Sequence, residues 1–494
     1  MPDLATWTQR AMTINPDSQI FIDGAFAPAA SGKTFESVYP GDNRVIAKIS
    51  AGDAADVNRA VASATRVFES GIWRDAPPLV KKTVMLKWAE LIMTHQEELA
   101  LLETLDVGKP IRDSMAVDTS SLARVIQWYG ETIDKTYDEI APTPKNAIAL
   151  ITREPLGVIG AIVPWNYPMI ISSWKIGPAL AMGNSIVVKP AENSSLSLLL
   201  VARLGIEAGL PPGVLNVVPG VGAEAGQALA RHMGVAKLAF TGSGPTGRKM
   251  LQYAAESNLK QVSLELGGKS PQIVLKDCVD LEVAAESIAW GIYYNSGQTC
   301  NAGSRLIVEK EIKSELFSKI EKFLKTFRVG NPLDPATQMG PLISKAQRER
   351  VNSYLDLIGI DGEQIVFGGQ KTKGDDLFML PTLIDNVKHH SRLSQEEIFG
   401  PVLVAIDARD EEHAIELANG TEYGLAASIW TNNIGKAHRI AKQLRAGTVW
   451  INTFDALDVI TPFGGFKSSG SGRDKSLHAL SAYSQLKTTW IDLS

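Results

Sequence analysis

The stretch from Gly157 to Pro168 reads GVIGAIVPWNYP and decides the class of fold. It opens with an apolar run that is typical of a strand buried on both faces, and it ends in a loop held between two prolines. A helical segment and a second apolar run, 185–188, come next, and 214–218 is a third such run. Strands that alternate with helices in this way predict a parallel, doubly wound sheet.

The alternation continues to Glu265 and restarts after Gly268. The strands expected in this later part are 272–275, 305–309, 402–405, 426–430 and 448–452. We therefore expect an α/β protein built from two doubly wound α/β domains. Ligands of such sheets bind beyond the carboxyl ends of the strands, so the cleft between the domains should hold the functional site.

Two extended segments, 137–154 and 483–494, depart from this rhythm because they alternate as single strands do. They could close a sheet edge within one chain or pair with another subunit. Nearer the N-terminus, the periodicity of 54–69 and of 80–106 predicts two helices.

The composition is that of an ordinary globular protein, with 45% hydrophobic and 21% charged residues among 494. A net charge of −5 gives no electrostatic reason to bind nucleic acid or an anionic membrane. Charges and prolines interrupt the most apolar window, 147–165, so we expect no membrane span, and no signal peptide is visible. Two cysteines and seven scattered histidines predict neither a disulfide framework nor a metal site, and a cytoplasmic protein is expected.

Cys300 lies in the stretch YNSGQTCNAG, which runs from Tyr294 to Gly303. A free cysteine is often a buried structural residue, so position alone leaves structure and nucleophile about equally favoured. Glu265 shifts this balance, because its carboxylate stands in the apolar, strand-like run VSLELGGKSP and its burial needs a purpose. A thiolate that forms a covalent intermediate needs a second group to bring in water, and a carboxylate can do so.

The motif ELGGKSP, followed by GQTC, resembles the NAD(P)-dependent aldehyde dehydrogenase superfamily, and further matches cover nearly the whole chain. The resemblance implies a Rossmann-like NAD-binding domain and a catalytic domain, with a small β element that joins subunits into a homodimer or homotetramer. The expected boundaries are 1–136 and 155–266 for the NAD-binding domain, 267–466 for the catalytic domain, and 137–154 with 483–494 for the oligomerisation element.

The segment GSGPTG, from Gly242 to Gly247, matches the dinucleotide motif G-x-G-x-x-G, and Glu265 follows near the spacing of a ribose ligand. We reject the ribose role for Glu265 but keep the phosphate role for the start of the helix, at Gly242, Ser243 and Gly247. In the family this segment reads Phe-Thr-Gly-Ser, as here from Phe240, so Gly244 creates the match by accident. A glycine-rich helix start without a ligand is the alternative.

Lys189 and Glu192 follow the strand 185–188 and are assigned to the adenosine side of the cofactor. A carboxylate accepts both ribose hydroxyls and repels a 2′-phosphate, which favours NAD over NADP. A solvated Lys–Glu pair is the alternative. By resemblance, Glu397 and Phe399 hold the nicotinamide ribose and ring, and Trp165 is also assigned to the cofactor.

Asn166 places an amide among aromatic residues and prolines, where a lone Asn is usually structural. The resemblance instead puts it at an oxyanion. In the chemistry that this implies, the Cys300 thiolate attacks the aldehyde, and Asn166 with the Cys300 backbone N–H stabilises the oxyanion. Hydride leaves for the nicotinamide, and Glu265 then activates water to hydrolyse the thioester.

Several positions match those that line the family's substrate tunnel, although the aromatic ones could equally be core residues. The residues assigned to the tunnel are Tyr167, Trp174, Tyr294, Leu457, Asp458 and Phe463. The stretch 455–480 is similar to a branch that oxidises γ-glutamyl-γ-aminobutyraldehyde and 4-guanidinobutyraldehyde. Leu457 and Asn301 depart from that branch and could narrow or redirect the tunnel.

The sequence thus predicts an NAD-dependent oxidoreductase that converts an ω-amino, γ-glutamylamino or guanidino aldehyde to its acid. Alternatives are an aromatic or aliphatic aldehyde or a semialdehyde as substrate. A CoA-acylating enzyme is disfavoured by Glu265, and a non-catalytic relative is disfavoured because Cys300, Glu265 and Asn166 occur together.

Overall fold

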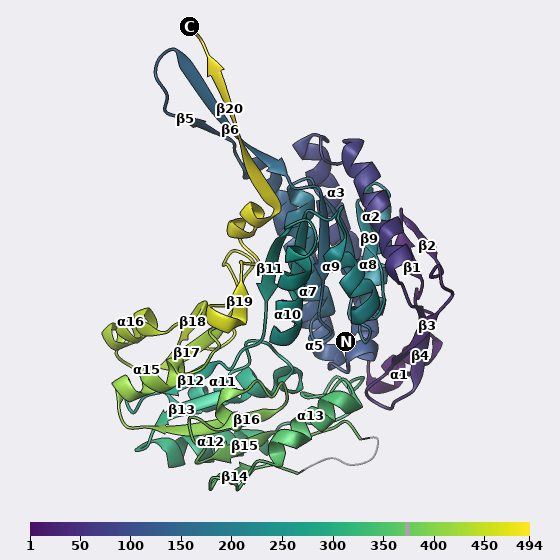
Figure 1. The fold of residues 1–494 in the computed structure, drawn as a ribbon. Helices are drawn as coiled ribbons and strands as arrows, with labels where there is room; N and C mark the ends of the chain where they lie inside the picture. Colours follow the sequence, from purple (N-terminus) through teal and green to yellow (C-terminus); the bar gives the residue numbers. More distant parts are fainter. Residues whose placement is uncertain (371–375) are drawn as a thin grey trace.

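The computed structural model describes residues 1–370 and 376–494 and separates the strands into two large sheets (Figure 1). The first sheet has eight strands in the order β19-β11-β10-β7-β8-β9-β1-β2, and its five central strands are parallel. These central strands are β7 (Val158–Ile162), β8 (Ser185–Lys189), β9 (Leu215–Val217), β10 (Lys237–Thr241) and β11 (Gln261–Glu265). Antiparallel strands add the edges, namely β1 (Ile20–Ile22), β2 (Ala25–Ala27) and β19 (Gly470–Ser471).

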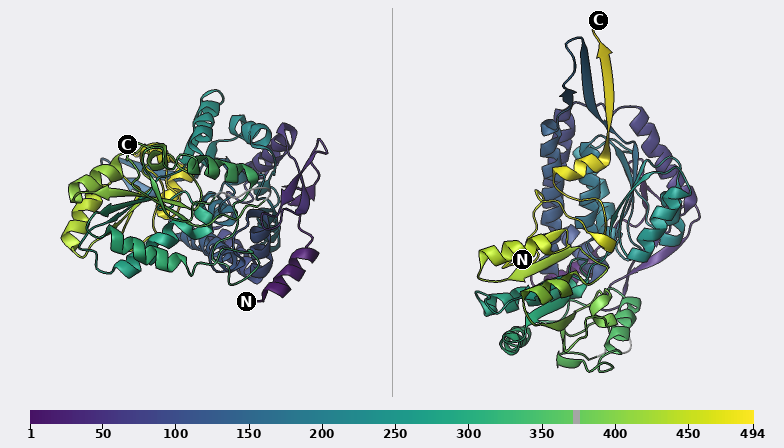
Figure 2. Two further views of the ribbon diagram at one scale, coloured as in Figure 1. Left: turned by 90° about the horizontal axis from the view of Figure 1, so that it is seen from below. Right: turned by 60° about the vertical axis from the view of Figure 1, so that its left-hand side comes forward.

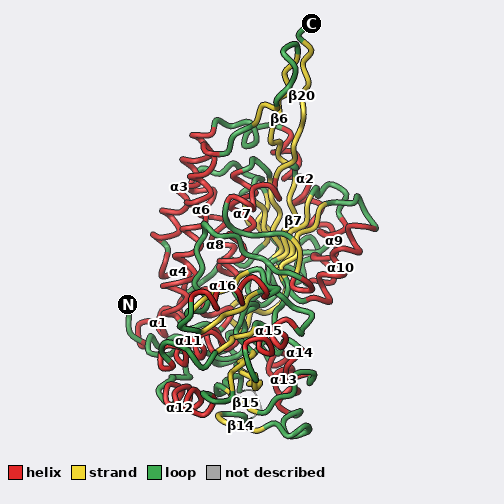
Figure 3. Tube along the Cα trace, turned by 90° about the vertical axis from the view of Figure 1, so that its left-hand side faces the viewer, coloured by secondary structure: helices red, strands yellow, loops and turns green. Residues whose placement is uncertain are grey.

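Helices cover both faces of this sheet (Figure 3). On one face lie α3 (Pro78–Thr94), α6 (Ser120–Thr132), α7 (Pro168–Ala181) and α8 (Leu196–Ala208), and on the other α2 (Ala54–Glu69), α9 (Gln227–Arg231) and α10 (Gly244–Ala255). Along β8, Ile186 and Val188 enter the first core, whereas Val187 enters the second. A strand that is buried on both faces carries apolar residues at successive positions, without alternating polar ones. For this reason the strands could be predicted from the apolar runs of the sequence.

The prediction of one helix over 80–106 is wrong, because the structure has two helices, α3 and α4 (Gln96–Val107). His95 leaves the helical conformation, with φ −97° and ψ 21°. Glu97 and Glu98 then lie in the first turn of α4, where their charge favours a helix N-terminus. Apolar residues continue across the break, so periodicity alone could not reveal it.

The second sheet has seven strands in the order β14-β15-β16-β13-β12-β17-β18, parallel except for β14. Its strands are β12 (Pro271–Val274), β13 (Arg305–Glu309), β14 (Gln364–Phe367), β15 (Thr382–Asp385), β16 (Val402–Ala408), β17 (Ala426–Trp430) and β18 (Thr448–Ile451). The helices α11 (Leu281–Tyr293) and α12 (Lys313–Leu324) pack on one face, and α13 (Lys345–Leu355), α15 (Glu411–Asn419) and α16 (Ile434–Gln443) pack on the other. The predicted fold class, two doubly wound α/β units, is confirmed.

Three antiparallel strands form an arm that projects from the body and carries the C-terminus at its tip (Figure 2). They are β5 (Glu139–Ala141), β6 (Ala147–Pro155) and β20 (Ser484–Asp492). The two extended segments predicted from sequence therefore pair with each other within one chain, from Ser484 opposite Pro155 to Asp492 opposite Ala147. Their role between subunits stays a prediction.

Among the described residues, three α-helices and one hairpin remain, besides short 3₁₀ and π-helical turns. They are the helices α1 (Leu4–Thr13), α5 (Ile111–Asp113) and α14 (Arg392–Gln395), and the hairpin of β3 (Thr34–Val38) and β4 (Val45–Ser50). Within the described ranges, every helix is too short or too polar to cross a membrane.

Candidate functional site

Cys300 lies in the loop between α11 and β13. The backbone of this loop turns sharply just before the cysteine. Asn295, Ser296 and Gly297 all have positive φ, of 49°, 57° and 70°. A Cβ on Gly297 would run into the carbonyl of Gly400, so only glycine fits at this approach of two loops. This loop carries the Cys300 thiol from the unit built on the second sheet towards the unit built on the first sheet.

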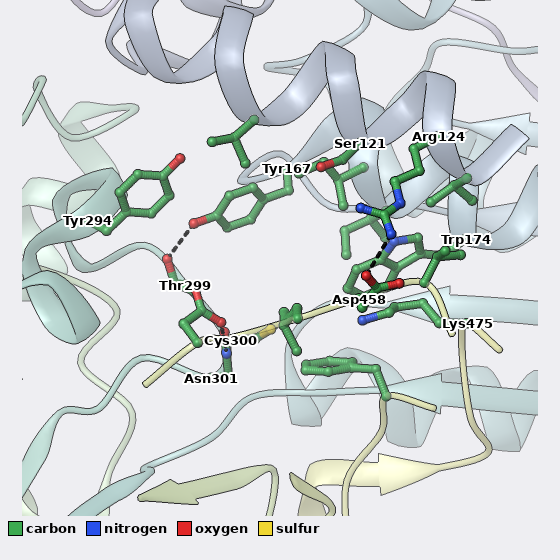
Figure 4. A pocket seen from close by; sticks show the side chains of 18 residues that line it. Ser121, Arg124, Tyr167, Trp174, Tyr294, Thr299, Cys300, Asn301, Asp458 and Lys475 are labelled. Atoms are coloured by element: carbon green, nitrogen blue, oxygen red, sulfur yellow. Dashed lines mark hydrogen bonds and ion pairs between the residues drawn. The ribbon is translucent and has the colours of Figure 1, made fainter. Parts of the chain in front are cut away.

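A cavity of about 240 Å³ opens at Cys300 (Figure 4). All six side chains that the sequence assigned to a tunnel line it, namely Tyr167, Trp174, Tyr294, Leu457, Asp458 and Phe463. The rings of Trp174 and Phe463 pack with their centroids 5.2 Å apart. Asn301, the departure just after the cysteine, also lines the cavity, and its side-chain amide donates to Asp455 at 2.7 Å.

The Cys300 thiol is held neutral by its surroundings. Burial raises its pKa well above the usual value, and the nearby carboxyl groups of Glu397 and Glu265 raise it further. A thiol becomes a nucleophile only as the thiolate, so this one needs a base or a neighbouring cation before it can attack.

Asn166 joins the loop after β7 to the cysteine loop. Its side-chain Nδ2 donates to the Gln298 carbonyl at 3.0 Å, and its backbone carbonyl accepts from Asn295 Nδ2 at 3.1 Å. A primary amide has two N–H groups, and the contact with Gln298 uses only one of them. The neighbouring Tyr167 hydroxyl lies 2.8 Å from Thr299 Oγ1 and adds a second link to the same loop.

Glu265 ends β11 as a carboxyl group that is only 5% exposed. Its Oε2 has no hydrogen-bond partner among the residues that the structure describes. Burial raises its pKa well above the usual value, Asp474 raises it further, and Lys175 and Arg473 oppose the shift. A side chain at Gly464 would come within 2.8 Å of Glu265 Oε1, so the glycine keeps space around this oxygen.

Lys175 and Asp474 form a buried ion pair beside Glu265, which sequence reasoning missed. One signal was present: a lysine within the otherwise apolar helix α7 demands a buried partner. Nothing in the sequence, however, marks Asp474 as that partner.

The residues assigned to the adenosine side of the cofactor lie at the carboxyl end of β8, in the first sheet. Lys189 ends β8 and is 2% exposed, with its Nζ 3.4 Å from Glu192 Oε2. Glu192 Oε1 accepts the backbone N–H of Gly222 at 2.6 Å. The pair is therefore anchored and is more than a solvated contact, while the Glu192 side chain stays 37% exposed.

Helix α10 begins directly after β10, at the Gly242–Gly247 segment. Within the described chain, the side chain of its N-cap residue Ser243 makes no capping hydrogen bond and instead bonds to Thr246 Oγ1 at 3.0 Å. A Cβ at Gly242 would lie 2.7 Å from the Phe240 ring. The helix start thus keeps uncapped N–H groups, as an anion site requires.

Glu397, Phe399 and Trp165 gather at the junction of the two units. Glu397 Oε1 accepts the backbone N–H of Gly268 at 3.0 Å, and burial raises the pKa of Glu397 to about 7. A side chain at Gly267 would collide with this carboxyl group. Phe399 has a φ of 63°, and its ring meets the Trp165 ring edge to face, with centroids 5.3 Å apart.

Two cations of the cavity were missed by sequence reasoning. Arg124 reaches it from α6 and pairs with Asp458 at 2.6 Å (Figure 4). Lys475 reaches it from the segment after β19. Arg124 carried no recognisable signal, because it belongs to a helix that is distant in sequence from the rest of the site.

Comparison with known proteins gives matches along the whole chain. The aldehyde dehydrogenase family model matches residues 26–489. The chain is 48% identical over 490 residues to the NADP/NAD-dependent aldehyde dehydrogenase PuuC of Escherichia coli (strain K12), covering 99% of both chains.

Two solved structures align over 100% of both chains with a TM-score of 0.98. One is the indole-3-acetaldehyde dehydrogenase AldA of P. syringae in complex with NAD+, at 49% identity. The other is the γ-glutamyl-γ-aminobutyraldehyde dehydrogenase of Burkholderia cenocepacia, at 48% identity. Fold, site and comparisons agree, and the chain belongs to the aldehyde dehydrogenase family.

Proposed function

We propose that this enzyme oxidises aldehydes to carboxylic acids with NAD as hydride acceptor, through a thioester on Cys300. One observation carries the proposal. Cys300 is the only described cysteine that lines the cavity. The buried Glu265 carboxyl group, whose Oε2 has no partner among the described residues, is near enough to raise the pKa of Cys300. The Asn166 amide donates to Gln298 in the cysteine's own loop. These are the nucleophile, base and oxyanion donor that acyl chemistry needs.

Each residue has a distinct role in this proposal. The Cys300 thiol gives up its proton to solvent, its sulfur bonds to the aldehyde carbon, and the second N–H of Asn166 donates to the resulting oxyanion. When bound, NAD takes up the hydride from that carbon. Glu265 then removes a proton from water, which attacks the thioester and releases the acid and the thiol.

The described residues fit a dinucleotide without a 2′-phosphate. The uncapped start of α10 suits the pyrophosphate, and Glu397 with Phe399 would hold the nicotinamide end. The Glu192 side chain is 37% exposed, so its carboxylate can still accept from ribose hydroxyls and would repel a phosphate there. NADP is therefore the weaker cofactor, although one relative is named for both.

We propose an aldehyde with a polar far end, of the ω-amino, γ-glutamylamino or guanidino type. The named activity of the Burkholderia relative supports the γ-glutamylamino member of this class, and the charged side chains that line the cavity, Arg124, Asp458 and Lys475, suit a polar far end. An aromatic aldehyde is the second candidate. It is favoured by the P. syringae relative and by the ring wall of Trp174 and Phe463.

The two cysteines allow a matched test of the nucleophile. Cys300→Ala should abolish NADH formation with every aldehyde of an ω-amino, γ-glutamylamino, guanidino, aromatic and aliphatic panel, while NAD still binds. Cys278 lies outside the cavity and hydrogen-bonds to the Asp280 carbonyl, so Cys278→Ala should keep wild-type kcat/KM. Loss of activity in Cys278→Ala with retention in Cys300→Ala would refute the proposal.

Assembly, domain limits and location are also proposals. We infer a cytoplasmic homodimer or homotetramer joined through 137–154 and 483–494, supported by exposed apolar side chains on the arm such as Ile140, Leu486 and Trp490. The NAD-binding limits 1–136 and 155–266 and the catalytic limits 267–466 are supported by the two separate sheets.

A further inference from the structure

Lys475 is a buried cation on the wall of the Cys300 cavity. It follows β19, has a φ of 63° and is 3% exposed. Its Nζ lies 5.4 Å from the ring centroid of Trp174 and 5.8 Å from that of Phe463. Figure 4 shows the side chain reaching into the cavity beside Asp458. Contacts with ring faces hold an ammonium in place without using its N–H groups.

Among the described residues, this ammonium has no hydrogen-bond or ion-pair partner. The acids near it are committed elsewhere: Asp458 to Arg124 at 2.6 Å, Asp455 to Asn301 at 2.7 Å, and Asp474 to Lys175. These acids attract Lys475 only through space, and burial lowers its pKa to about 8. It is still mostly charged at neutral pH, and a buried charge without a partner is costly.

A ligand carboxylate would supply the missing partner. We propose that Lys475 determines specificity by binding a carboxylate at the far end of the substrate, opposite the aldehyde that reaches Cys300. The inference rests on the proposed function and names the substrate class within it. A preference for a carboxylate is the opposite of a preference for cationic substrates. Asp458 is already neutralised by Arg124, and the positive charge of Lys475 would repel a purely cationic tail.

The test uses two aldehydes that differ only at the far end. N-glutaryl-4-aminobutanal ends in a carboxylate, and N-pentanoyl-4-aminobutanal ends in a methyl group. A charge-assisted hydrogen bond corresponds to about 10- to 100-fold in binding, so the wild type should favour the glutaryl aldehyde in kcat/KM by about that factor. Lys475→Met should bring the ratio close to one, mainly through the KM of the glutaryl aldehyde.

Two further variants separate charge from packing. Lys475→Arg keeps the cation and should retain most of the preference. Lys325→Met removes an exposed lysine after α12 that does not line the cavity, and it should leave the ratio unchanged. Equal losses for both aldehydes in Lys475→Met would make Lys475 a structural residue and overturn the inference, as would a wild type without preference.

Unreactive analogues keep the test decisive if Lys475→Met does not fold. N-butylglutaramate should inhibit the wild type at a concentration at least about 10-fold below that needed with N-butylpentanamide, and equal inhibition overturns the inference. Failure of the proposed function can be told apart from failure of this inference, because the wild type would then form no NADH from either aldehyde. A wild type that oxidises both aldehydes equally refutes only the role of Lys475.

Discussion

Glu265→Gln separates the two roles that the sequence allows for this residue. As a ribose ligand, Glu265 would control the affinity for NAD. As the base of deacylation, it acts only after hydride transfer, when water attacks the thioester. Glutamine keeps the shape and can hydrogen-bond, but it cannot take a proton at neutral pH. Because Glu265 Oε2 has no partner among the described residues, the substitution breaks no hydrogen bond at that oxygen.

The expected loss follows from the value of general-base assistance, about 10²–10⁴-fold. Steady turnover of Glu265→Gln should fall by that factor. Hydride transfer precedes the step that is lost, so the variant should release a burst of one NADH per active site and then stall. If Glu265 also deprotonates Cys300, the burst shrinks as well, and pre-incubation at higher pH should restore it.

The pH profile provides an independent check. Burial and Asp474 raise the pKa of Glu265, so its basic form accumulates only as pH rises. The steady turnover of the wild type should therefore increase as pH rises through that pKa. This rise of turnover with pH should be absent in Glu265→Gln. Stopped-flow NADH absorbance measures the burst, and an NAD titration measures binding. Glu315→Gln, on the exposed side of α12, is the matched control and should behave as the wild type.

Two results would contradict the role of Glu265 as the base of deacylation. If Glu265→Gln weakens NAD binding but turns over normally at saturating NAD, Glu265 is a ribose ligand and the literal dinucleotide motif at Gly242–Gly247 is meaningful. Release of acid at the wild-type rate without a stalled burst would likewise remove Glu265 as the base.

Three other predictions concern the oxyanion, the cofactor and the arm. Asn166→Ala should lower kcat by about 10²–10³, the usual loss for one oxyanion donor, whereas a change confined to KM would give Asn166 a positioning role. Glu192→Gln should weaken NAD binding and raise kcat/KM with NADP relative to NAD, and a wild type that already prefers NADP contradicts the assignment. Deleting 483–494 should lower the assembly mass measured by light scattering, and an unchanged mass would return β20 to a simple sheet edge.

The two sheets were predictable because their strands are buried on both faces. β7 and β8 consist entirely of buried residues, and such runs stand out between helices in any reading of the chain. The arm strands were also visible, because β6 and β20 alternate as single strands do. What the sequence could not show was their pairing with each other, since register between distant segments depends on the completed fold.

The cavity was predictable in part. Its aromatic wall and Asp458 came from motif resemblance, and the structure places all six assigned side chains around one space. The balance of charges on the cavity wall was not predictable from sequence, because the pairing of Arg124 with Asp458 joins residues 334 positions apart. Asp458 alone would favour a cationic aldehyde, but an Asp458 paired with Arg124 does not.

The pairing of Lys175 also explains why Glu265 can be a strong base. Lys175 lies near two buried acids, Glu265 and Asp474, and forms its ion pair with Asp474. Had it paired with Glu265, the attraction would have held that carboxyl group as an anion and lowered its pKa, so that it would take a proton from water less readily. Because Asp474 holds the lysine, Glu265 keeps a raised pKa and an unpartnered oxygen. The same arrangement makes the carboxyl group costly to bury, and an unpartnered buried acid of this kind is typical of a functional site.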